Sequence, residues 1–182
     1  MSVAWRRTPT RAARTVRFAA KAMLCTLFTT VACAAAFDDG LAAFVRADYA
    51  TAIRHWEPLA EAGNADAQYN LGSMYENGQG AARDYTAAVR FYRRAAAQGH
   101  PDAQFNLAKL YEGGNGVPQD SVRAYVWFAV SANISLNGML WSGIAALTSR
   151  DVLAARLPPD QLVVARALVR RCEDTNFTAC GD

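Results

Sequence analysis

The sequence predicts an all-α protein: a short right-handed solenoid of antiparallel helix pairs, built from 36-residue repeats and closed by a C-terminal helical cap. The stretch DAQYNLGSMYENGQG, which begins at Asp66, returns as DAQFNLAKLYEGGNG at Asp102. Within each copy the apolar residues recur at the spacing of one helix face, and glycines follow them. A unit of this kind buries its apolar face only against its neighbours, so we expect the units to stack.

The two copies stay in register beyond the opening stretch. Pairs of matching residues 36 positions apart include Ala67/Ala103, Leu71/Leu107, Tyr75/Tyr111, Asp84/Asp120 and Tyr92/Phe128. Upstream, Asp48, Ala52 and Trp56 match only the second half of the pattern. The predicted organisation is therefore an incomplete first repeat at 37–64 and two full repeats at 65–100 and 101–136.

Each repeat is expected to hold two helices. Gly78 can close the first helix in the left-handed conformation, and Asp84 and Asp120 stand where a side chain can cap the second. In the first repeat the second helix contains Pro58, which removes a backbone hydrogen bond. We expect that proline to kink or split the helix near Arg54.

The chain after Asn133 leaves the repeat pattern, and residues 137–182 are predicted to form the helical cap. Pro158 and Pro159 mark a break between two helix-like stretches. The side chains expected to face the core are Leu140, Trp141 and Ile144. Cys172 and Cys180, eight positions apart, are expected to form a disulfide in an oxidising compartment, with two free thiols as the alternative.

Residues 1–36 are predicted to be a signal peptide. Six Lys and Arg precede the apolar run Ala22–Ala32, and small residues at Ala34 and Ala36 suit cleavage before Phe37. The mature protein would begin near Phe37 and be periplasmic or secreted. Two alternatives stay open: an uncleaved anchor, which would give inner-membrane association, and lipid attachment at Cys33.

The charge of the remaining chain argues against nucleic acid as a partner. Without the six N-terminal cations, 13 Lys and Arg face 16 Asp and Glu, a net charge of −3. Proteins that bind nucleic acid usually carry a basic patch or stripe instead.

The repeats resemble the Sel1-like repeat, a relative of the tetratricopeptide repeat, over about residues 40–133. The middle unit matches its pattern at Ala67, Leu71, Gly72, Tyr75, Gly78, Gly80, Asp84, Ala88, Tyr92, Ala95, Ala96 and Gly99. Ala81, Ala108 and Phe91 depart from it. One branch of this family is linked to β-lactam binding, but that branch pairs cysteines within each repeat, and Ala67–Asn133 contains none.

The resemblance implies a non-catalytic interaction scaffold whose first helices line a concave face that binds a protein or peptide. The residues predicted to contact the partner are Asn70, Ser73, Asn77, Asn106 and Lys109. The alternative for these positions is an ordinary solvent-facing surface.

No catalytic, metal-binding or cofactor-binding residue is predicted. The two histidines, His55 and His100, lack Cys, His or carboxylate neighbours at metal-ligand spacing. The paired glycines follow helices instead of strands, unlike those of a phosphate-binding loop. Two other functions stay open: an envelope assembly or structural factor held by an uncleaved signal, and a small-molecule-binding or hydrolytic protein.

Overall fold

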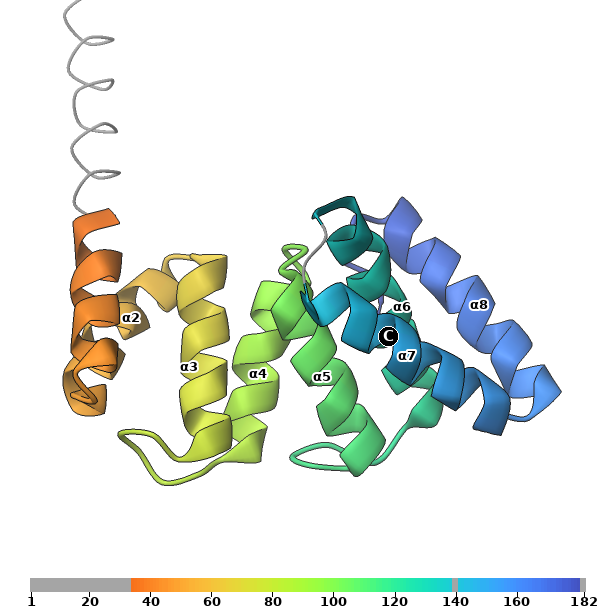
Figure 1. The fold of residues 1–182 in the computed structure, drawn as a ribbon, viewed down its shortest axis with the longest axis horizontal. Coiled ribbons are helices and arrows are strands. Elements are labelled where there is room, and N and C mark those ends of the chain that lie inside the picture. Colours follow the sequence, from red (N-terminus) through yellow and green to blue (C-terminus); the bar gives the residue numbers. More distant parts are fainter. Residues whose placement is uncertain (1–33, 139–140, 181–182) are drawn as a thin grey trace, which may run out of the picture.

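The computed structural model describes residues 34–138 and 141–180, and in them it contains helices and no strand. Residues 34–45 are helical, and the remaining helices follow one another to the far end of the molecule (Figure 1). These are α2 (Tyr49–Glu61), α3 (Ala65–Asn77), α4 (Tyr85–Ala96), α5 (Pro101–Gly113), α6 (Ser121–Gly138), α7 (Trp141–Arg156) and α8 (Pro159–Asp174). The predicted all-α solenoid is confirmed.

From α2 to α7, each helix packs against the next one along the chain to form the solenoid. α3 packs against α4, α5 against α6 and α6 against α7, and α4 packs against α5 between the first two pairs. The first helices also form a layer of their own, because α3 touches α5 and α5 touches α7. Side chains on that layer can therefore act together across units.

The helix ends follow the signals seen in the sequence. Asp84 and Asp120 each accept a hydrogen bond from the backbone N–H three residues on, at 3.0 and 2.9 Å. Gly78 and Gly114 close α3 and α5 with φ of 69°, a left-handed conformation that costs glycine little. Each repeat thus turns at matching places.

The first unit has a first helix too, formed by residues 34–45. Phe37 lies 5.9 Å from Trp56 between ring centroids, and the Trp56 indole N–H donates to the Phe37 carbonyl at 3.2 Å. Gly40 packs so closely on Trp56 that an added Cβ would lie 2.4 Å from Nε1, and Gly72 packs on Tyr92 in the same way.

The spacing between these contacts explains why the 36-residue alignment did not find that helix. Gly40 precedes Trp56 by 16 positions, whereas Gly72 precedes Tyr92 by 20, so the first loop is four residues shorter. The predicted boundary between signal peptide and repeat, after residue 36, falls within this helix and stays a prediction. Residues 1–33 of the predicted signal, including Cys33, lie outside the described residues.

Two buried glutamines tie each repeat to the one before it. The Gln68 amide donates to the carbonyl of Ala60 at 2.8 Å, and the Gln104 amide donates to that of Ala96 at 3.1 Å. Both side chains are almost completely buried. Each glutamine adds a hydrogen bond to a carbonyl at the end of the preceding helix, which also accepts from the glycine N–H three residues on, Gly63 at 3.1 Å and Gly99 at 3.0 Å.

The expectation that Pro58 splits the second helix of the first unit is wrong. α2 runs without interruption from Tyr49 to Glu61, with Pro58 inside it. Pro58 lies in the last turn, and its own carbonyl still accepts from the N–H of Ala62 at 3.0 Å. The proline removes one N–H donor there, and burial of Trp56 and Leu59 holds the turn in place.

The C-terminal helices cover the end of the repeats in an arrangement of their own. Both α7 and α8 pack against α6, and α7 also touches α5. A disulfide joins Cys172 to Cys180, as the sequence indicated. We call residues 172–180 the disulfide loop; within it the Phe177 N–H donates to the Cys172 carbonyl at 2.8 Å.

The expectation that Ile144 faces the core is wrong, because its side chain is 59% exposed. The buried stripe of α7 contains Ala146 and Leu153, and Leu157, directly after the helix, continues it. Since each residue turns a helix by about 100°, Ile144 lies on the other side from Ala146. The side chains of Leu140 and Trp141 lie outside those described.

Candidate functional site

The exposed side of the first helices is the surface on which the predicted partner-binding residues lie. On α3 and α5 the core stripe is completely buried, and the opposite side carries half-buried or exposed residues in matching positions. We call this side of α3 and α5 the first-helix face. Its members are Asp66, Tyr69, Asn70, Ser73, Glu76, Asn77, Asp102, Phe105, Asn106, Lys109 and Glu112.

Three of the predicted residues keep polar groups available on this face. Asn70 is half-buried, and no hydrogen bond within the described part of the chain involves its side chain. Asn77 donates to Ser73, at 2.9 Å to the carbonyl and 3.3 Å to the hydroxyl. Since the amide nitrogen of Asn77 makes both bonds, its amide oxygen can still accept from a ligand.

Lys109 is exposed and lies near an aromatic ring of the same helix. Its ammonium nitrogen is 6.0 Å from the centroid of the Phe105 ring, which is within reach of a weak cation–π interaction. It is the single lysine on a face that otherwise carries acids, amides and aromatic rings.

Asn106 has a structural role besides its place on the face. Its amide donates to the Tyr92 hydroxyl at 3.2 Å, and that hydroxyl donates to the Glu76 carboxylate at 2.7 Å. Burial, together with the charge of Glu76 and its hydrogen bond, raises the pKa of Tyr92 far above the ordinary tyrosine value. This network joins the first helices of two repeats.

Two glutamates belong to the same face and were missed in the sequence. Glu76 and Glu112 are 36 positions apart, and each follows the repeat tyrosine. Glu112 lies 3.9 Å from Arg156 of α7, so both glutamates reach toward the following unit. Their equal spacing was the available signal, but residues next to a core tyrosine look like ordinary surface until the neighbouring helix is placed.

The acids give the first-helix face a negative field. Asp66, Glu76, Asp102 and Glu112 lie on it, whereas Lys109 is its only formal cation. Such a cluster raises the local concentration of cationic groups and favours a partner with Lys or Arg side chains.

His100 forms the end of this face between the two units. Its Nδ1 accepts from the backbone N–H of Ala103 at 3.2 Å, and its Nε2 lies 3.4 Å from the Asp66 carboxylate. The imidazole stacks on Tyr69 with a centroid distance of 4.6 Å. Burial and the nearby Asp102 raise the pKa of Tyr69. His100 therefore caps α5 and holds Tyr69 in place.

Residues 34–138 and 141–180 contain neither a metal-binding cluster nor a membrane-spanning helix. There, no three His, Cys, Asp or Glu residues come together in a way that could hold a metal ion. None of the helices described is long and apolar enough to cross a bilayer.

The comparison with family models decides the identity of the repeats. The model described as the Sel1 repeat matches residues 31–64, 65–100 and 101–133, which is more than half of the chain. The chain belongs to the Sel1 repeat family. Sel1 repeat proteins are generally non-catalytic scaffolds for protein–protein interaction. The match begins at residue 31 and therefore takes in the helix at 34–45.

Two solved structures resemble this Sel1 repeat protein. The c5321 protective antigen of uropathogenic Escherichia coli, described as having an SLR fold, is 27% identical with a TM-score of 0.70. That match covers 81% of this chain, which spans about a third (31%) of the antigen structure. A Sel1 repeat protein from Oxalobacter formigenes is 36% identical with a TM-score of 0.50, covering 56% of this chain and 79% of that one. A comparison with curated proteins gave no significant match.

Proposed function

We propose that this Sel1 repeat protein is a non-catalytic adaptor of the bacterial cell envelope that binds a protein or peptide on its first-helix face. The observation that carries the proposal is the repetition of acid, aromatic and amide side chains at matching positions of α3 and α5. Because these helices touch, one extended segment can contact both sets. Repeated, evenly spaced groups suit a ligand that is itself repetitive, as an extended backbone is.

The chemistry of the face favours a polar segment with basic residues. Asn70 and Asn77 retain hydrogen-bonding capacity for a peptide backbone. The four acids can pair with Lys or Arg of the partner, and such charges mainly raise the association rate and select the partner. Tyr69 and Phe105 are partly buried and offer ring surface beside the amides.

Crosslinking capture from the native envelope, with a C-terminally tagged chain and mass spectrometry, tests the proposal. We expect one dominant partner, lost when Asn70, Ser73 and Lys109 are changed together to Ala. Asn106 is left unchanged because of its bond to Tyr92. The matched control changes Arg54, Glu57 and Thr86, three exposed residues of the second helices α2 and α4, to Ala.

The control variant distinguishes specific binding of the partner on the first-helix face from non-specific binding to the whole surface. Equal loss of the partner in both triple variants, or equal retention in both, would contradict binding on the first-helix face. Circular dichroism of the two variants shows whether the solenoid stays folded in each case.

We also propose that the protein is exported to the periplasm or secreted. The Cys172–Cys180 disulfide and the similarity to a protective antigen support an oxidising, exported location. Intact-mass measurement of the protein from its native envelope tests cleavage. A chain beginning near Phe37 supports a cleaved signal, whereas an intact N-terminus supports the anchored assembly factor instead.

A further inference from the structure

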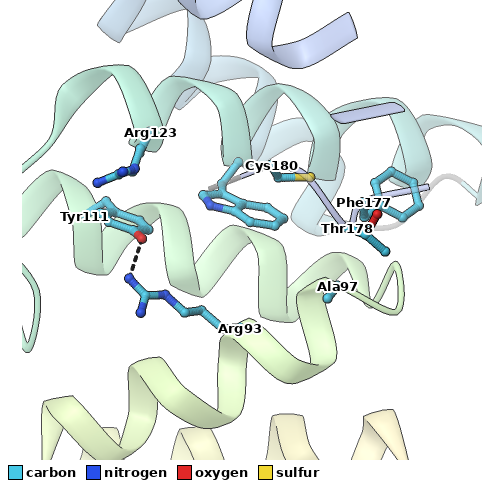
Figure 2. A pocket seen from close by; sticks show the side chains of 8 residues that line it. Arg93, Ala97, Tyr111, Arg123, Phe177, Thr178 and Cys180 are labelled. Carbon is cyan, nitrogen blue, oxygen red and sulfur yellow. Dashed lines mark hydrogen bonds between the residues drawn. The ribbon is translucent and has the colours of Figure 1, made fainter. Parts of the chain in front are cut away.

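A cavity of about 260 Å³ lies between the second and third repeats and the disulfide loop. Arg93 of α4, Tyr111 of α5 and Arg123 of α6 line one part of it, and Phe177 and Thr178 of the loop line the other (Figure 2). This cavity shares no lining residue with the first-helix face.

The polar groups that line the cavity are predominantly donors. The Arg93 guanidinium donates to the Tyr111 hydroxyl at 2.6 Å, and both guanidiniums lie over the Tyr111 ring, at 5.6 and 5.9 Å from its centroid. Arg123 has a carboxylate partner, Asp120, at 3.5 Å. In the described chain no carboxylate pairs with Arg93, and none lines the cavity.

A buried donor without a partner adds a second, independent observation. Trp127 of α6 lines the same cavity and is only 4% exposed. Its Nε1–H has no acceptor among the described residues. A buried N–H without an acceptor costs free energy, and an acceptor placed in the cavity would relieve that cost.

The size and the lining of the cavity indicate which kind of chemical group carries the hydrogen-bond acceptor of the ligand. The cavity is partly open to solvent, and its volume of about 260 Å³ leaves room for a ring-sized group. Phe177, Ala97 and the indole of Trp127 supply apolar surface. An aromatic or apolar group the size of one amino-acid side chain fits this description.

The repeat pattern itself does not produce this site. One unit earlier, the positions equivalent to Arg93, Arg123 and Trp127 hold Glu57, Ala87 and Phe91. That unit keeps the tyrosine, Tyr75, which stacks on Phe91 at 5.7 Å. Only the later junction therefore combines two guanidiniums with an indole donor.

We propose that this cavity binds a carboxylate carried on a small aromatic or apolar body, with Arg93, Arg123 and the Trp127 N–H as its donors. The planar fork of a guanidinium matches a carboxylate with two parallel hydrogen bonds, so the excess positive charge of the cavity selects an anion. The ring surface of Phe177 and Trp127 selects the body.

Calorimetric titration of the purified full chain with benzoate tests the proposal, with benzamide as the uncharged probe of the same shape. We expect benzoate to bind at millimolar concentration and benzamide not to bind. Arg93→Met should weaken benzoate binding by about tenfold or more, since a charge-assisted hydrogen bond is lost. Arg90→Met, an exposed arginine of the same helix outside the cavity lining, should leave it unchanged.

Three outcomes would overturn the proposal. The first is equal affinity for benzoate and benzamide, or no binding of either probe. The second is binding of inorganic phosphate as tight as that of benzoate, which would mean that charge alone is recognised. The third is benzoate binding of unchanged affinity in a folded Arg93→Met chain, which would mean that the Arg93 guanidinium is not one of the donors.

Trp127→Phe separates the indole donor from the apolar wall. Phenylalanine stands at the equivalent position 91, so the fold should tolerate it, and a denaturation curve checks this. We expect weaker benzoate binding with the ring surface kept. Unchanged affinity in a folded Trp127→Phe chain would show that the buried N–H has no part in the site.

Discussion

Equivalent glutamines, Gln68 and Gln104, form the junctions before the second and the third repeat, but their surroundings differ. At the earlier junction Gln98 donates to the Gln68 side-chain oxygen at 2.8 Å, and Arg94 donates to the Ala60 carbonyl at 2.6 Å. At the later junction the side-chain oxygen of Gln104 is buried without a partner. Ile134 and Val130 stand where Gln98 and Arg94 would be.

The difference follows from what covers each junction. The second helix α4 keeps polar groups beside the glutamine, some of them exposed. The second helix α6 is covered by both α7 and α8, and from Ala124 to Ala132 all its residues are buried. A buried arginine there would need a partner for its charge, so apolar residues are favoured. The repeat sequence therefore sets the glutamine–carbonyl hydrogen bond between units, and the helices that cover each junction determine whether its other residues are polar or apolar.

Leu71→Asp is the strongest way to break the comparison, because it places a charge in the fully buried centre of the second repeat. We expect a loss of at least about 4 kcal/mol in the free energy of unfolding, since an unpaired buried charge is among the largest single-residue effects. Urea denaturation followed by circular dichroism measures it. An unchanged midpoint would refute the stacking of this unit.

Gly72→Ala tests the close approach that the second repeat needs and the third does not. A Cβ at position 72 would lie 2.7 Å from the Tyr92 ring, whereas Ala108 stands at the matching place opposite Phe128. We expect Gly72→Ala to cost about 2 to 3 kcal/mol through overpacking. Ala108→Gly should cost about 0.5 to 1 kcal/mol, from glycine in a helix. Thermal denaturation of both variants measures the two losses of stability, and we expect the loss for Gly72→Ala to be the larger.

Gln68→Leu and Gln104→Leu compare the two junctions directly. Gln68→Leu removes one donor and one acceptor that are both in use, so we expect a loss of about 1 to 2 kcal/mol. Gln104→Leu should cost less, because it also removes an oxygen that is buried without a partner. Chemical denaturation of the two variants side by side measures the difference. A larger loss for Gln104→Leu would reverse our account of the junctions.

Alkaline pH should weaken the second repeat through Tyr92, whose counterpart in the third repeat is Phe128. The pKa of Tyr92 is raised in the folded chain, mainly by burial and then by Glu76. Tyr92 therefore stabilises the fold fully below the ordinary tyrosine pKa of about 10, and this contribution is lost as the pH rises above it. Urea denaturation at successive pH values above 10 measures the free energy of unfolding. We expect this free energy to fall less steeply with pH in Tyr92→Phe than in the wild type.

Asn70→Ala should have the smallest effect on stability. No described hydrogen bond involves the Asn70 side chain, so we expect a change within about 0.5 kcal/mol. Asn106→Ala, its counterpart, should cost more because the bond to Tyr92 is lost. Equal melting temperatures for the two variants would remove the distinction we draw between a free and a structural amide.

The sequence by itself determined the local features of the repeats. Helix faces, the glycine stop at Gly78 and the aspartate caps all depend on residues within one or two turns, so periodicity was enough to predict them. It failed where the period changes, at the shorter first loop, and where several helices meet in space. Ile144 was predicted to face the core but is exposed, and Pro58 was predicted to kink or split α2, which is continuous.

Only the tertiary structure decided which polar groups meet. Glu76, Tyr92 and Asn106 are joined because α3, α4 and α5 lie together, and Arg93 and Arg123 share a cavity because the disulfide loop closes over their helices. Local propensity acts through the backbone of neighbouring residues and repeats with the sequence. Burial and electrostatics act across space, so a single loop length or covering helix gives equivalent positions different roles.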